Sequence, residues 1–132
     1  MTSAIQKRFS GKTLPLKKLC LDISDCLHAT PNWTDSGKIV IRNFNFKNGR
    51  ISLKNLSYTD SETFNERIRR SKPEPGDLII SREAPMGEIC IISEGVECCL
   101  GQRLVLIKPD VEKCNNKYLL YYFILVNLVI VM

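Results

Sequence analysis

The order of apolar and polar positions along the chain predicts a strand-rich fold. Short apolar runs bounded by turn residues indicate strands. We expect strands at residues 38–42, 50–56, 77–81, 88–93, 96–100 and 103–108. Asn48-Gly49 is a strong turn signal between the first two runs. Glu94-Gly95 is the shortest loop and predicts an antiparallel hairpin between 88–93 and 96–100.

Two helices are expected as well. Thr59-Asp-Ser-Glu62 has the pattern of a capping box, in which Thr59 caps a helix of about three turns. That helix should end near Arg70, before the prolines of the segment 72–77 turn the chain. Asn115 or Asn116 can cap a final helix. We therefore predict an α+β fold, with a strongly twisted, mainly antiparallel sheet and a few peripheral helices.

The 132 residues suffice for one domain of ordinary size. We divide the chain into a basic N-terminal segment (1–13), a globular domain (14–117) and an apolar C-terminal helix (118–132). The last segment carries no charge, but it is shorter than the ~20 residues of a membrane span. We expect no membrane partner, and a buried helix whose covering partner lies outside this chain or is supplied by self-association.

Composition and charge narrow the classes of function. Hydrophobic residues make up 44% and charged residues 25%, which excludes a disordered tail and a multi-pass membrane protein. The net charge is +5, and residues 37–72 hold nine bases against three acids. Residues 73–99 reverse that balance, with six acids and Arg82 as their one base. The basic part suits phosphates, although a solvated mixed surface is an equal alternative.

The six cysteines occur without a C-x-x-C pair or a signal peptide. We therefore predict free thiols and a cytoplasmic protein, with three disulfides as the alternative. Catalytic patterns are also missing, because the seven glycines form no phosphate-binding loop and His28 is the one histidine. A Cys26–His28 dyad is weak on spacing alone. We expect neither a catalytic site, nor a cofactor, nor a metal site.

A binding surface is the chemistry that the residues favour. The stretch 42–50, Arg-Asn-Phe-Asn-Phe-Lys-Asn-Gly-Arg, interleaves bases, amides and aromatic rings. Arg and Asn side chains can each make two-point contacts with base edges, and further bases suit phosphates. The alternative is a plain hairpin whose Phe44 and Phe46 pack inward. A second candidate loop, 81–87, holds Arg82, for which an internal salt bridge with Glu83 is an equal alternative.

Taken together, several segments of the chain resemble a target recognition domain of the specificity subunit of Type I restriction–modification systems. The resemblance covers roughly residues 14–125, in order and with plausible spacing. The matching segments are 25–31 (Asp-Cys-Leu-His-Ala-Thr-Pro), 41–43 (Ile-Arg-Asn), the Asn48-Gly49 turn, Tyr58, the basic run 67–70, 75–87 (Pro-Gly-Asp-Leu-Ile-Ile-Ser-Arg-Glu-Ala-Pro-Met-Gly), 99–103 (Cys-Leu-Gly-Gln-Arg) and 118–123.

The resemblance implies a non-catalytic subunit that binds duplex DNA. In that family each of two domains reads one half of a split target, and long helices bind methyltransferase subunits that restriction subunits join. This sequence departs from the family because it has no second domain and no long spacer helix, and because residues 124–132 are apolar. A fragment or a truncated gene would explain both departures, and it places assembly with the partners in question.

Our leading hypothesis is therefore sequence-specific recognition of duplex DNA, with basic residues on phosphates and a few side chains on base edges. The alternatives are a protein-interaction module that docks through 118–132 and an inactive remnant; a stand-alone nuclease is a third class. The candidate DNA-binding residues are Arg42, Asn43, Lys47, Arg50, Arg69, Arg70, Lys72, Arg82 and Arg103.

Overall fold

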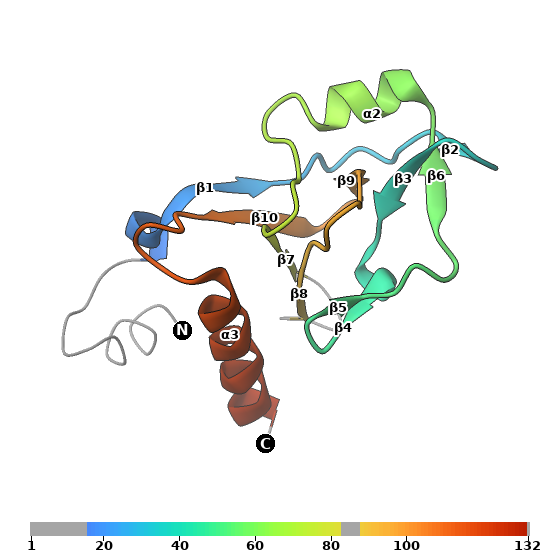
Figure 1. Ribbon diagram of the computed structural model, residues 1–132. Coiled ribbons are helices and arrows are strands. Elements are labelled where there is room, and N and C mark those ends of the chain that lie inside the picture. Colours follow the sequence, from blue (N-terminus) through green and yellow to red (C-terminus); the bar gives the residue numbers. More distant parts are fainter. Residues whose placement is uncertain (1–15, 83–87, 132) are drawn as a thin grey trace.

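The computed structural model describes residues 16–82 and 88–131. A short 3-10 helix, η1 (Leu16–Leu19), leads into the first of two four-stranded sheets (Figure 1). Its strand order is β1–β10–β7–β8, and all its pairings are antiparallel. The strands are β1 (Cys20–Asp25), β10 (Leu104–Pro109), β7 (Leu78–Ser81) and β8 (Ile89–Ile91).

The second sheet has the order β2–β6–β3–β9, in which β3 and β9 are parallel. Its strands are β2 (Trp33–Thr34), β6 (Ser57–Thr59), β3 (Lys38–Ile41) and β9 (Cys98–Leu100). A turn of 3-10 helix, η2 (Asn43–Asn45), precedes a two-stranded ribbon of β4 (Phe46–Lys47) and β5 (Arg50–Ile51). The α+β class with mainly antiparallel pairing is thus confirmed, and the strands divide between two sheets.

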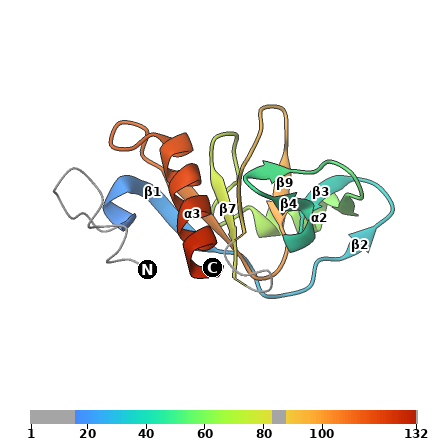
Figure 2. The same cartoon turned by 90° about the horizontal axis from the view of Figure 1, so that it is seen from below.

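Two helices cover the sheets on different sides (Figure 2). The long helix α3 (Asn116–Val131) packs Leu119 into a buried cluster with Leu78 and Ile89 of the first sheet. The short helix α2 (Ser61–Arg67) lies over the second sheet, where Phe64 is buried with residues of β3 and β9. Between the sheets, a further cluster of buried apolar side chains includes Ile41, Ile79, Cys90, Cys98 and Leu104.

The hairpin expected between 88–93 and 96–100 is wrong. Glu94-Gly95 does form a turn, with Gly95 at a φ of +82°, but β8 pairs with β7 and β9 pairs with β3. The reason is burial on both faces of β9. Cys98 faces the cluster between the sheets, and Cys99 faces the cluster beneath α2.

The expected cap and end of the first helix also need correction. The cap of α2 is Asp60, whose carboxylate accepts a hydrogen bond from the Thr63 amide at 2.7 Å. The Thr59 hydroxyl instead donates to the carbonyl of Asn32 at 2.7 Å. The helix ends at Arg67, before the expected Arg70. Residues 69–72 are polar or charged and Pro73 follows them, so a longer helix would bury no further apolar side chain before the proline ends it.

One turn prediction and one cap prediction are confirmed, and one strand prediction is wrong in length. Asn48 and Gly49 have φ values of 52° and 87°, the left-handed conformation that a two-residue hairpin requires, and they join β4 to β5. The strand expected at 50–56 is limited to Arg50–Ile51. Asn115 caps α3, since its side chain accepts a 2.8 Å hydrogen bond from the Lys117 amide.

Candidate nucleic-acid interface

Four loops meet where β1, β3, β7 and β9 end, and we call this surface the loop face. It comprises residues 26–31, 42–43, 82 and 101–103. Backbone hydrogen bonds join the loops: the Gly101 amide donates to Ile41 at 2.8 Å, and the Arg82 amide donates to Arg103 at 2.9 Å. The register of the strands therefore places segments from four parts of the chain side by side.

Two side chains fix the shape of the loop face. Gln102 donates from its amide to the His28 carbonyl and to the Thr30 hydroxyl. Arg67, at the end of α2, donates to the carbonyls of Leu100 at 2.9 Å, Ala29 at 2.8 Å and Leu27 at 3.0 Å. All three acceptors belong to the loop face or border it, so Arg67 holds the 26–31 loop to the end of β9.

Arg42 lies on the loop face between aromatic rings. The central carbon of its guanidinium is 4.6 Å from the centre of the Trp33 ring and 4.7 Å from that of Phe44. Its amide donates to the side chain of buried Asn45 at 2.9 Å. The alternative of a plain hairpin with both phenylalanines packed inward holds for Phe46, which is 2% exposed, and not for Phe44, which is 58% exposed.

Three other predicted residues lie on the same face. Arg82 forms an ion pair of 2.9 Å with Asp25, with both side chains about half exposed. The alternative partner, Glu83, lies outside the described residues. Arg103 is exposed and adopts a φ of +63°, and Asn43 is half-buried at the start of η2. The structure therefore brings Arg42, Asn43, Arg82 and Arg103 together.

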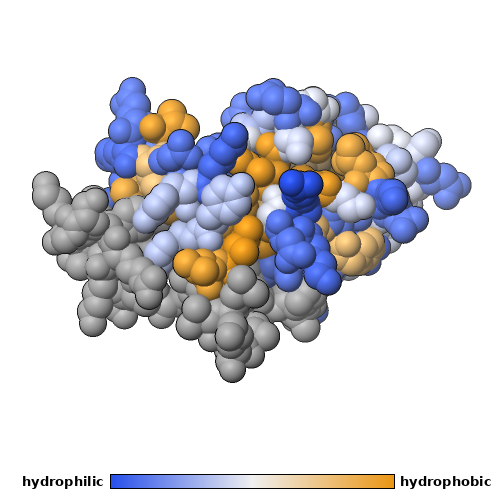
Figure 3. Space-filling view, turned by 60° about the horizontal axis from the view of Figure 1, so that its bottom comes forward, coloured by the Kyte–Doolittle hydropathy of each residue, from blue (hydrophilic) through white to orange (hydrophobic). Residues whose placement is uncertain are grey.

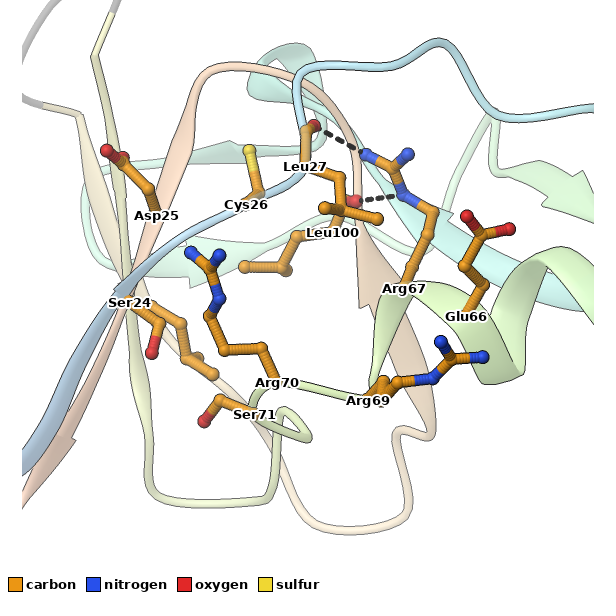
Figure 4. A pocket seen from close by; sticks show the side chains of 11 residues that line it. Ser24, Asp25, Cys26, Leu27, Glu66, Arg67, Arg69, Arg70, Ser71 and Leu100 are labelled. Atoms are coloured by element: carbon orange, nitrogen blue, oxygen red, sulfur yellow. Dashed lines mark hydrogen bonds between the residues drawn. The ribbon is translucent and has the colours of Figure 1, made fainter.

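A cleft of about 310 Å³ opens beside the loop face (Figure 4). Its lining residues are Ser24, Asp25, Cys26, Leu27, Glu66, Arg67, Arg69, Arg70, Ser71, Leu100 and Leu106. Arg70 extends toward Asp25 and Cys26, whereas Arg69 extends past Glu66. Because Asp25 both lines the cleft and pairs with Arg82, the cleft adjoins the loop face.

The remaining candidates are more dispersed. Lys47 and Arg50 are exposed on the β4–β5 ribbon, which the Gly49 amide attaches to Ile89 at 2.9 Å. Lys72 lies 3.9 Å from Glu97, which also pairs with Lys38 at 3.1 Å. Lys38 begins β3 and Arg42 follows its end, so Lys72 is directed to the opposite end of the second sheet from the loop face.

Burial and backbone contacts define the settings of the cysteines. All six are free, as expected. Burial raises the pKa of Cys98 to about 12 and that of Cys99 to about 11, so both thiols stay protonated near neutral pH. The Cys26 sulfur, the candidate partner of His28, accepts a hydrogen bond from the Leu104 amide at 3.1 Å. Within residues 16–82 and 88–131, His, Cys, Asp and Glu form no group of three that could hold a metal ion.

Sequence reasoning missed three residues that shape the surface. Trp33 supports Arg42, Asp25 pairs with Arg82, and Gln102 ties two loops together. The sequence did hold a signal for Trp33, because it is the one tryptophan and it lies in a polar segment, whereas large apolar side chains are usually buried. In the structure Trp33 is 40% exposed. The partners of Asp25 and Gln102 are 57 and 74 residues away, and no local pattern marks them.

The chain matches no protein-family model and no curated protein sequence. It does match solved structures. One is a chain from a study of complex assembly and conformational transition in the type I R-M system, with a TM-score of 0.59 and 20% identity. Another is the HsdS subunit of Thermoanaerobacter tengcongensis, with a TM-score of 0.56 and 22% identity. The chain has an HsdS fold.

The HsdS likeness extends over nearly all of this chain but only part of its neighbours. The matches cover 96% and 94% of this chain, and 32% and 31% of the respective neighbours. The chain therefore spans about a third of the length of these HsdS-type structures. The fold implied by the resemblance in the sequence is confirmed. In the described part of the chain, no helix is long and apolar enough to cross a membrane.

Proposed function

We propose that this chain is a target recognition domain that binds duplex DNA in a sequence-specific manner, within a Type I restriction–modification specificity subunit. The observation that carries the proposal is the loop face. Its four strand ends bring Arg42, Asn43, Arg82 and Arg103 onto one surface that continues into the arginine-lined cleft. The HsdS fold supports the same assignment.

The proposed mechanism separates positioning from reading. Phosphate contacts set the register of a protein on DNA, and base-edge contacts in the major groove supply specificity. Arg69 and Arg70 at the cleft, and Lys47 and Arg50 on the ribbon, are exposed cations that suit phosphates. In this proposal Arg42 and Asn43, which lie on the loop face, make the contacts with base edges. Lys72, engaged by Glu97, contributes long-range attraction at most.

The partners follow from this assignment. The chain supplies specificity, and methylation and cleavage reside in methyltransferase and restriction subunits that join it in the cytoplasm. One domain would read one half of a split target. The chain itself is proposed to be non-catalytic, without a cofactor or a metal ion.

A selection from a random duplex pool tests the proposal. The purified chain is mixed with the pool at low and at moderate salt, and bound duplexes are sequenced. We expect enrichment of a motif of about 3–5 base pairs, the size of one contact module in the major groove. Binding without enrichment that weakens steeply with salt would indicate phosphate contacts alone, and would refute the specific function.

Arg70→Ala examines the positioning role of the cleft. Loss of one phosphate contact should lower affinity evenly across sequences and reduce the slope of log affinity against log salt by about one unit. Lys113→Ala is the matched control, because Lys113 is 61% exposed and its neighbour is Asp110, outside the proposed surface. A sequence-selective loss in Arg70→Ala would contradict a phosphate role.

The exposed side of α3 favours a second candidate, a protein-interaction module. Tyr118, Tyr121 and Leu125 are 47%, 66% and 52% exposed, and they share a shallow apolar surface with Tyr122. Figure 3 shows pale and orange side chains gathered over this helix. Sedimentation velocity separates the candidates. A chain that self-associates, returns to a monomer with Tyr121→Glu and ignores DNA would support the interaction module over DNA recognition.

A further inference from the structure

We infer that Arg42 is the residue that specifies a base, and that the base is a guanine contacted in the major groove at O6 and N7. Trp33 and Phe44 act as positioning residues for the Arg42 guanidinium. The inference rests on the proposed function and deepens it, because it assigns one base and one side chain within the recognition surface.

Arg42 combines two properties that Arg67 and Arg82 do not share. Its guanidinium is held, because its central carbon lies over both the Trp33 ring and the Phe44 ring. Its N–H groups are nevertheless available, since none donates to an acceptor within the described part of the chain. By contrast, the guanidinium of Arg67 is bound by three carbonyls and that of Arg82 by Asp25.

The backbone around Arg42 is fixed as well. Its amide donates to Asn45, and the neighbouring Ile41 carbonyl accepts from the Gly101 amide at 2.8 Å. A Cβ on Gly101 would lie 3.2 Å from the Ile41 carbonyl oxygen and 3.6 Å from Cγ of Arg42. The aliphatic part of Arg42 therefore packs beside Gly101, and both ends of the side chain are restrained before any ligand binds.

A restrained donor fork suits guanine better than a phosphate. Guanine presents two acceptors, O6 and N7, side by side in the major groove, whereas adenine presents a donor beside N7. The planar guanidinium offers two parallel N–H groups at the matching spacing, and stacking on rings reduces the side-chain entropy lost on binding. A phosphate can also accept two N–H groups from arginine, but a point charge such as lysine serves there as well, so a phosphate contact does not require the fork to be held in one plane.

The first test compares the chain with Arg42→Lys, which keeps the charge and removes the fork. The enriched motif should contain one guanine that the normal chain requires. In Arg42→Lys, preference for that guanine over adenine should fall by roughly 5- to 150-fold, the usual range for a good two-point contact. Preference at the other positions of the motif should stay unchanged.

A chemical substitution in the DNA identifies the contact. Replacing the required guanine by 7-deazaguanine removes the N7 acceptor and leaves the pairing intact. We expect the normal chain to lose several-fold in affinity and Arg42→Lys to lose nothing further, as in a double-mutant cycle between contacting groups. Equal losses in both proteins would place another side chain on the guanine and overturn the inference.

Variants of Trp33 and Phe44 test whether these rings position the Arg42 guanidinium without contacting phosphates themselves. Trp33→Ala and Phe44→Ala should each weaken the guanine preference without changing the salt dependence of binding. Val111→Ala, which trims an exposed apolar side chain between β10 and α3, is the control and should change neither. Circular dichroism melting verifies that each variant is folded.

The outcomes distinguish the two proposals. Selective DNA binding with a required guanine that depends on Arg42 supports both. Selective binding whose motif lacks a required guanine, or whose guanine preference survives in Arg42→Lys, overturns the role of Arg42 and leaves the proposed function standing. An absence of selective binding by the normal chain overturns both, because Arg42 then reads no base.

Discussion

Replacing Arg67 by methionine removes the cation that joins α2 to the loop face and keeps a side chain of similar length. Arg67 donates to the carbonyls of Leu100, Ala29 and Leu27. The substitution leaves these three acceptors without their donor. We expect the 26–31 loop to detach from the end of β9, and the free energy of unfolding to fall.

The magnitude follows from the three hydrogen bonds. A hydrogen bond to a charged group contributes about 1.5–3 kcal/mol when it is shielded from water. The bonds to Leu100 and Leu27 are partly buried and the bond to Ala29 is exposed. Two shielded bonds at the lower end of that range give a loss of about 3 kcal/mol. With a urea m-value of about 2 kcal/mol/M, the unfolding midpoint falls by about 1.5 M.

Urea unfolding followed by circular dichroism measures this loss, with Lys113→Met as the control for replacing an exposed cation. Limited proteolysis adds a local readout, because residues 26–31 should become cleavable under conditions in which β7 and β10 stay intact. If Arg67→Met lowers the midpoint no more than Lys113→Met does, the three hydrogen bonds do not hold the loop face together. The reasoning about the cleft would then also fail, since Arg67 lines it.

Three further predictions concern packing and charge. Lys108→Met leaves the buried carboxylate of Asp77 without its ion pair. The free energy of unfolding, measured in urea, should fall by about 3 kcal/mol. Adding Asp77→Asn to the same chain should recover most of this stability if the unpaired charge is the cause. Hydrogen bonds from the Thr63 amide and Asn32 hold the pKa of Asp60 below its usual range. The stabilisation by this carboxylate is therefore present above the ordinary carboxyl pKa and is lost as the pH falls through the lowered value. The melting temperatures of the normal chain and Asp60→Ala should converge in acid, and a constant gap would count against the cap. Gly37→Ala should lower the melting temperature more than Gly95→Ala does. The new Cβ at position 37 would lie 2.6 Å from the Thr59 backbone oxygen at a φ of +132°, whereas the one at position 95 meets open space at a φ of +82°. Equal losses in melting temperature would show that the clash near Thr59 is relieved.

The parts of the fold that the sequence predicts are those governed by neighbouring residues. β3, β7 and β10 coincide with apolar runs because most of their side chains are buried. The edge strand β1 was missed, since its side chains alternate between half-buried and exposed and Leu21 is 73% exposed. The two-residue β2 is too short for any periodicity. The pairing of β9 with β3 joins residues 59 positions apart, which no local turn signal reveals.

The same distinction between contacts with neighbouring residues and contacts with distant residues applies to the candidate site, as Arg42 and Arg67 illustrate. In the sequence both are arginines of one basic stretch. The amides and rings of 42–50 mark Arg42 as a candidate, and Phe44 of that stretch does contact it. No neighbouring residue reveals the role of Arg67, because the carbonyls that bind it lie 33 to 40 residues away. Composition predicts how many cations a surface holds. The cations available to a ligand are those that the carbonyls and carboxylates of the fold do not engage, and tertiary structure decides which ones these are.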